Sequence, residues 1–120
     1  YRGETRCDVD IGLRPEKLPE NYVVHPWPPY PNPAGKIVYL DYERIIPRGE
    51  DFSENCALYN TLGQMIMTGE PKIESIREYE NAKVEYGKYI FDLHGLPQGV
   101  YIIVMESKYK TYTFTVLVER

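Results

Sequence analysis

The sequence predicts an all-β protein, an antiparallel β-sandwich of about seven strands. Apolar and polar residues alternate with period two in several segments, which is typical of strands with one buried face. Turn residues separate these segments roughly every ten residues. Twelve tyrosines also suit half-buried strand faces, because the ring packs while the hydroxyl stays in water. A chain of 120 residues is large enough for one such domain with a single core.

An irregular, Pro-rich lead-in is expected over residues 1–35. Residues 1 to about 20 show neither strand nor helix period, and Tyr22–Val24 is a candidate for a short first strand. Residues 25–35, HPWPPYPNPAG, carry five of the ten prolines and are expected to be extended polyproline II. Such a segment either docks in an aromatic groove of a partner or stiffens the entry to the domain, and we favour the second.

The sandwich domain is expected over residues 36–120. In KIVYLDYE, residues 36–43, the period-two alternation predicts its first full strand. Proline and glycine mark residues 45–54 as a loop.

A hairpin is expected next, with strands at Cys56–Leu58 and Met65–Met67 and a turn that Gly63 permits. Residues 69–85 leave two interpretations open. Apolar residues three positions apart fit a helical turn, whereas Pro71 and the even scatter of charge fit an edge strand and a loop.

The last third of the chain is plainer. A strand from Tyr89 to Leu93 leads into a GLPQG corner at 95–99, and the apolar run 100–106 forms the next strand. Residues 107–110 make a hairpin turn, and 111–119 return as the final strand. The predicted core consists of Val38, Leu40, Leu58, Phe91, Leu93, Tyr101, Ile103, Phe114 and Val116.

Three motifs in order carry a family resemblance: YPNPAG at 30–35, LYNTLGQMI at 58–66 and FDLHGLPQGVYIIVM at 91–105. With these motifs, residues 30–120 resemble the C-terminal sorting domain of proteins exported by the type IX secretion system of Bacteroidetes. The chain is also similar to small, free-standing secreted Bacteroidetes proteins with the same sandwich and no assigned activity.

The resemblance implies an immunoglobulin-like β-sandwich, in agreement with the strand pattern. Physical reasons for the motif residues are structural: glycines at turns, an asparagine that bonds its own turn, leucines that plug the sandwich end, and a tyrosine that ties a strand to the preceding corner. These residues are Asn60, Gly63, Leu96, Gly99 and Tyr101.

No catalytic constellation is evident in the sequence, so we expect no enzyme, no cofactor and no metal site. None of the three serines lies in a G-x-S-x-G elbow. The two histidines, His25 and His94, have no second ligand at metal-binding spacing. DVDIG at 8–12 lacks the remaining acidic positions of a calcium loop. The many carboxylates between residues 70 and 85 are spread evenly, as on a solvated edge.

Charge and hydropathy restrict the classes of partner, and the two cysteines leave a free thiol or a disulfide open. A net charge of −4 without a basic run argues against nucleic-acid binding. No apolar run is long enough to span a bilayer, and no signal-peptide pattern is present. A start at Tyr1 is compatible with a processed or truncated chain. Cys56 is expected to be a buried free thiol, and a disulfide with Cys7 is the alternative.

Exposed tyrosines are the feature with binding potential. They could line a platform for a protein or glycan partner, although filling a strand surface is the favoured interpretation. The candidates are Tyr79, Tyr86, Tyr89, Tyr109 and Tyr112.

Two functions remain, both non-enzymatic. The favoured one is a free-standing interaction module, secreted or in the cell envelope of a Gram-negative bacterium, because only about thirty residues precede the first motif. The alternative is a sorting domain recognised by type IX export machinery. Its partner would be the secretion machinery, whereas a free-standing module would bind a surface protein or a glycan.

Overall fold

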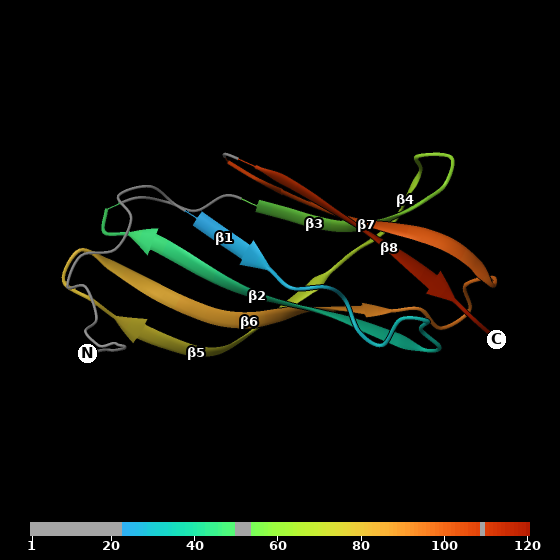
Figure 1. Cartoon of the computed structure of the whole chain (residues 1–120), viewed down its shortest axis with the longest axis horizontal. Coiled ribbons are helices and arrows are strands. Elements are labelled where there is room, and N and C mark those ends of the chain that lie inside the picture. Colours follow the sequence, from blue (N-terminus) through green and yellow to red (C-terminus); the bar gives the residue numbers. More distant parts are fainter. Residues whose placement is uncertain (1–22, 50–53, 109) are drawn as a thin grey trace, which may run out of the picture.

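The computed structural model describes residues 23–49, 54–108 and 110–120, and within these ranges the chain is all-β. Eight strands form two antiparallel sheets of four strands each, which pack face to face (Figure 1). The predicted antiparallel β-sandwich is therefore confirmed.

The first sheet has the order β1-β2-β6-β5. Its long central pair, β2 and β6, is in continuous register from Ile37 opposite Asp92 to Pro47 opposite Ala82. The strands of this sheet are β1 (Val23–Pro26), β2 (Ile37–Pro47), β5 (Glu70–Glu78) and β6 (Ala82–Asp92).

The second sheet has the order β4-β3-β7-β8. Its strands are β3 (Glu54–Asn60), β4 (Met65–Thr68), β7 (Gly99–Ser107) and β8 (Thr111–Val118). If the strands are lettered along the chain as in immunoglobulin domains (A, B, C, C′, D, E, F, G), the spatial orders of the two sheets are ABED and C′CFG, as in that fold. This order supports the immunoglobulin-like prediction.

The core lies between the sheets and follows the period-two alternation. In β2 every second residue from Val38 to Ile46 is buried, because those side chains face the second sheet. Eight of the nine predicted core residues are buried, and the exception is Phe114, which is half-buried and packs against the core from outside. Phe114 lies in β8, the edge strand of the second sheet.

An irregular lead-in was expected over residues 1–35. Of these, the structure describes residues 23–35, and they take part in the sandwich. Residues 23–26 form β1, and Tyr30 and Ala34 form bridges to Tyr39 and Val118. The segment is also not continuous polyproline II, since the Tyr30–Pro31 and Asn32–Pro33 peptide bonds are cis. The sandwich thus begins before the expected boundary at residue 36.

Two further segments differ from expectation. The loop predicted at 45–54 starts later, because β2 continues to Pro47, where a residue without an N–H is tolerated at a strand end. In the segment 69–85 the edge-strand interpretation is correct and the helical one is wrong. All nine residues of β5 are exposed, so no period of buried residues could mark it.

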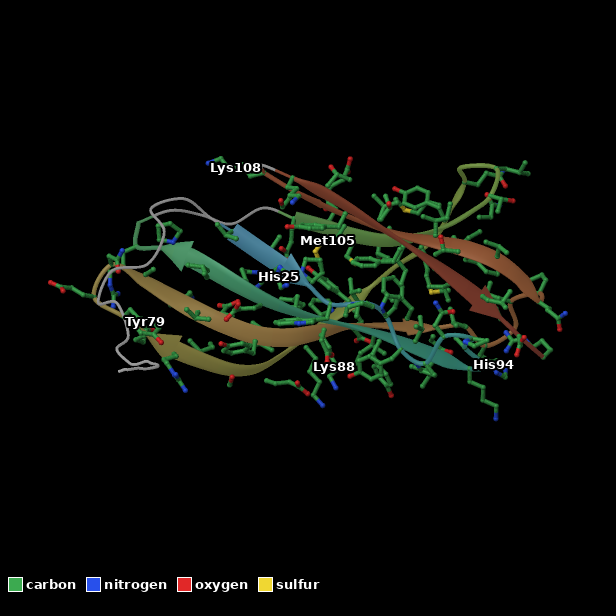
Figure 2. All side chains as sticks on the ribbon, viewed as in Figure 1. His25, Tyr79, Lys88, His94, Met105 and Lys108 are labelled. Atoms are coloured by element: carbon green, nitrogen blue, oxygen red, sulfur yellow. The ribbon has the colours of Figure 1, made fainter. Side chains whose placement is uncertain are left out.

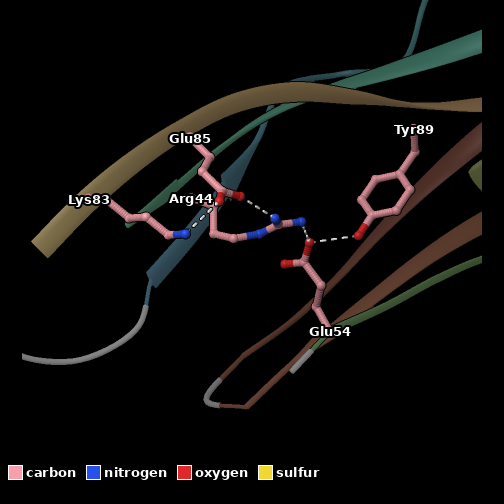
Figure 3. A network of polar contacts seen from close by, with 5 residues as sticks. All are labelled: Arg44, Glu54, Lys83, Glu85 and Tyr89. Carbon is pink, nitrogen blue, oxygen red and sulfur yellow. Dashed lines mark hydrogen bonds and ion pairs between the residues drawn. The ribbon is translucent and has the colours of Figure 1, made fainter. Parts of the chain in front are cut away.

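A buried network of ion pairs and hydrogen bonds links the two sheets (Figure 3). Arg44 from β2 donates to Glu85 on the neighbouring β6 at 2.6 Å and to Glu54 on β3 of the opposite sheet. Tyr89 donates to the same Glu54 oxygen at 2.6 Å, and Lys83 Nζ lies 3.4 Å from Glu85 Oε2. Burial, followed by the hydrogen bond to Glu54, raises the pKa of the Tyr89 phenol.

We expect Arg44→Met to destabilise the fold by about 3–5 kcal/mol, because it removes the arginine from two buried carboxylates, Glu54 and Glu85. Glu78→Gln is the control. Glu78 pairs with Arg48 at 3.3 Å, but both side chains are more than half exposed, so breaking this ion pair should cost about 0–1 kcal/mol. Chemical denaturation measures both. Similarly small losses of unfolding free energy in the two variants would show that the buried network matters no more for stability than the exposed ion pair.

We expect Gly87→Ala to cost about 1–3 kcal/mol, because the added Cβ would lie 2.5 Å from the Lys72 carbonyl oxygen and 2.7 Å from the Tyr42 hydroxyl. At Gly35 a Cβ would meet no heavy atom within 4 Å, so Gly35→Ala should change the unfolding free energy by less than about 0.5 kcal/mol. Denaturant titrations compare the two, and equal stability of the variants would refute the predicted clash.

Candidate functional site: the motif end

The three sequence motifs come together at one end of the sandwich, which we call the motif end. It comprises the turn 60–64, the β6–β7 corner at 93–98, the segment 32–35 and residues 117–120. Figure 1 shows the β3–β4 turn, the corner and the C-terminus at the same end of the molecule. Hydrogen bonds join the segment 32–35, the corner and residues 117–120, and the turn 60–64 lies at the same end of the sandwich.

Asn32 and Ala34 close the outer edge of β8. The Asn32 side chain donates to the Thr115 carbonyl at 2.9 Å and accepts from the Leu117 N–H at 3.0 Å. Ala34 N–H donates to the Leu117 carbonyl at 2.7 Å, and Glu119 N–H donates to the Ala34 carbonyl at 2.9 Å. The Pro-Asn-Pro-Ala motif thus bonds to backbone groups that an edge strand otherwise leaves unpaired.

The β6–β7 corner contains a tyrosine corner. The Tyr101 hydroxyl donates to the Pro97 carbonyl at 2.8 Å, as the sequence predicted. Leu96 N–H donates to the Leu93 carbonyl at 3.0 Å, and the Leu96 side chain packs against the core. Gly99 opens β7 directly after this corner.

The β3–β4 turn is held by its own asparagine. Asn60 Oδ1 accepts from the Leu62 and Gln64 N–H groups at 2.9 and 3.0 Å, and its amide donates to Gln64 Oε1 at 2.8 Å. Gly63 has a φ of 85°, which a residue with a Cβ rarely adopts. Both residues have the turn roles that the motif implied.

Arg120 ties these segments together. Its guanidinium donates to the carbonyl oxygens of Leu93 at 2.6 Å, Leu96 at 2.8 and 3.0 Å, and Gly35. Its N–H donates to Gln98 Oε1 at 3.2 Å. The guanidinium therefore joins the Pro-Asn-Pro-Ala-Gly segment, the corner and the residues after β8. Neither this contact set nor the role of Asn32 was expected from the sequence.

The fold and this end define a class, a β-sandwich module whose sequence motifs close one end of the sandwich. Residues 29–119 match the family described as Secretion system C-terminal sorting domain. Because the match covers most of the chain, the chain belongs to this family, and the resemblance to type IX sorting domains is confirmed. No curated protein and no solved structure gives a significant match. Family membership implies a secreted or envelope protein that interacts with secretion machinery.

The five candidate tyrosines do not form one exposed platform. Tyr86 is exposed, and Tyr79 and Tyr112 are half-buried. Tyr112 donates its hydroxyl to the Val24 carbonyl at 3.1 Å and packs against the core. Tyr89 is only 5% exposed and bonds to Glu54 of the ion network, so the expectation that it is exposed was wrong. Tyr109 lies outside the described residues.

The two histidines do not converge. His25 is exposed on β1 and stacks edge-on against Trp27, whereas His94 is exposed in the corner, and Figure 2 shows them well apart. Among the described residues, no three His, Cys, Asp or Glu side chains are placed to hold a metal ion. The same residues include no helix that is long and apolar enough to cross a bilayer.

Two hollows lie outside the motif end. A cleft of about 430 Å³ opens beside β4 and β5, and the buried groups Arg44, Glu54 and Tyr89 line it. The second, of about 440 Å³, is lined by aromatic residues that include Trp27, Tyr30 and Tyr86. Trp27 and Tyr30 were missed in the sequence because the prolines around them indicated only a stiff segment.

Cys56 is a buried free thiol, as expected, and its proposed partner Cys7 lies outside the described residues. Burial, followed by the nearby Glu54 carboxylate, raises the pKa of the Cys56 thiol to about 12.

This shift predicts a pH dependence of stability. Above the ordinary thiol pKa of about 8.5, the unfolded chain loses the Cys56 proton while the folded chain keeps it, so stability falls as pH rises. Between pH ~8 and ~9.5, we expect the unfolding free energy of a Cys7→Ser variant to fall by roughly 1 kcal/mol more than that of Cys7→Ser/Cys56→Ala. Urea titrations at each pH measure it, and parallel curves for the two variants would contradict the assignment.

Proposed function

We propose that this chain is the sorting module of a secreted or cell-envelope protein of a Gram-negative bacterium, recognised by type IX export machinery. The match of residues 29–119 to the sorting-domain family carries this proposal. The gathering of the three motifs at one end supports it further, because a partner could contact all of them at once.

The family match favours sorting over the free-standing module that we expected first. That expectation rested on the short lead-in before the first motif. Sorting is therefore the function that the observations support better.

The domain acts in this proposal by binding and not by catalysis. At the motif end, the side chains of Asn32, Asn60, Tyr101 and Arg120 are all engaged in hydrogen bonds within the fold. Such groups fix the shape of a surface. A fixed shape lowers the ordering cost of association, which favours recognition by a partner.

Two arginines of similar contacts at opposite ends of the sandwich provide the test. Arg120 donates to carbonyl groups at the motif end. Arg48, at the far end of β2, donates to the carbonyl oxygens of Glu80 and Tyr79 at 2.7 and 2.6 Å. Replacing either with glutamine removes comparable bonds, each contributing about 0.5–1.5 kcal/mol, but only one change alters the motif end.

We expect Arg120→Gln to reduce export of the natural protein in its own host well below that of Arg48→Gln at matched thermal stability. The measurements are the fraction of protein on the cell surface and in the medium, and the melting temperature of each purified variant. A strain without type IX machinery should retain the unaltered protein. Export that follows melting temperature alone, or that persists in that strain, would refute the sorting role.

A further inference from the structure

An aromatic hollow lies on the outer face of the first sheet, away from the motif end contacts. Trp27 and Tyr30 border it on one side, from the segment that follows β1, and Tyr86 of β6 borders it too. These three rings remain 42, 41 and 39% exposed. Large aromatic side chains gathered around one hollow of about 440 Å³ match the size and lining of small-ligand sites.

The backbone holds this hollow open. Trp27 N–H donates to the Asp41 carbonyl at 2.9 Å, and Tyr30 and Tyr39 exchange two backbone hydrogen bonds of 2.9 and 2.8 Å. These bonds fix the Trp27–Tyr30 segment against β2. The Tyr30 ring also packs on Tyr39 with centroids 5.5 Å apart. The aromatic wall is thus preorganised by a strand pairing, which lowers the ordering cost of a ligand.

The polar groups of the hollow are two carboxylates and a nearby ammonium. Asp41 accepts from the Tyr30 hydroxyl at 3.0 and 3.2 Å, and one donor leaves most lone pairs of a carboxylate unused. Glu74 sits at the irregularity in β5, where the register shifts between Ile73 and Ser75. Lys88 Nζ lies 3.4 Å from Glu74 Oε2, and Figure 2 shows Lys88 pointing outward from the first sheet.

These groups discriminate between ligand classes. Lys88 offsets one of the two carboxylates, which leaves a single negative charge that disfavours an anionic ligand and is compatible with a neutral one. The hollow offers acceptors at Asp41 and Glu74 beside flat apolar rings, and the Lys88 ammonium is paired with Glu74. A pyranose sugar carries hydroxyls that donate and accept at its edge and an apolar C–H face that packs on an aromatic ring. Sugar chemistry therefore complements both the rings and the mixed polar groups.

We propose that the hollow between Trp27, Tyr30 and Tyr86 is a binding site for a neutral saccharide, with Asp41 and Glu74 accepting hydrogen bonds from sugar hydroxyls. This site is separate from the motif end, so the proposal does not depend on the sorting role. It assigns the domain a saccharide-attachment function. The part of the Pro-rich segment that serves it is Trp27–Tyr30, whereas residues 32–35 belong to the motif end.

Trp27 makes the proposal directly testable, because it is the single tryptophan of the chain and it lines the hollow. The full chain is titrated with cellobiose, maltose, lactose and N,N′-diacetylchitobiose while tryptophan fluorescence is recorded. We expect a saturable change with at least one of them below about 50 mM, within the weak range of single-site recognition.

Three variants localise the binding. Tyr86→Ala removes an exposed ring and should weaken the affinity at least about tenfold, because a lost aromatic contact of this kind is worth about 1.4 kcal/mol. Asp41→Asn keeps the size of the side chain and should weaken it several-fold through the lost charge-assisted bonds. Tyr59→Ala is the matched control, since Tyr59 is half-buried on the second sheet. Melting curves confirm that each variant folds.

No fluorescence change with any of the four disaccharides on folded protein would overturn the proposal. So would a response that Tyr86→Ala and Tyr59→Ala affect equally, since it would not arise in the hollow. A Pro-rich peptide titrated in parallel distinguishes a saccharide ligand from a peptide ligand. Saturation by that peptide without any saccharide response would identify the hollow as a peptide groove and overturn the saccharide assignment.

Discussion

The unpaired edge of β8 is the constraint on which the motif end depends. An open sandwich has edge strands whose N–H and C=O groups are unpaired, and proteins must cover them or make them unattractive to other chains. Here the side chain of Asn32 and the backbone of Ala34 bond to β8 in place of a further strand. Arg120 then fixes the covering segment to the β6–β7 corner. One set of bonds therefore closes this part of the edge and fixes the shape of the motif end.

The other side of the sandwich solves the edge problem differently. The chain crosses between the sheets at Gly69, whose N–H donates to the Cys56 carbonyl at 2.8 Å. A Cβ at this crossing would lie 2.8 Å from the Phe91 ring, so only glycine brings the two strands this close to the core. The following strand, β5, is exposed along its whole length and carries charged residues at most of its positions. Edge charge discourages pairing with other chains without any covering segment.

The buried ions add specificity to this arrangement. Arg44 reaches Glu85 within its own sheet and Glu54 across the sandwich, so it fixes the relative position of the sheets. A buried ion pair gives little net stability compared with apolar packing, because desolvation offsets the attraction. Its effect is on which arrangement is stable: a shift of β2 by one residue would leave both carboxylates without the arginine. The network therefore adds to the burial pattern of β2, which already opposes a one-residue slip because that slip would turn its buried side chains outward.

How much the sequence could predict follows from the range of each interaction. Local patterns, such as the alternation around Leu40 and the turn residues Asn60 and Gly63, determine structure within a few residues and were predicted correctly. The β5 strand could not be, because a strand exposed on both faces has no apolar period. Asn32 lies 83 residues from its partner Thr115, and no local pattern encodes that distance. Tyr89 shares the strand face of Phe91 and Leu93, so the same alternation that predicted those two core residues already indicated that it is buried. The motifs therefore identified the family before the contacts that explain them could be known: turn chemistry is local, whereas the closing of an edge depends on the whole topology.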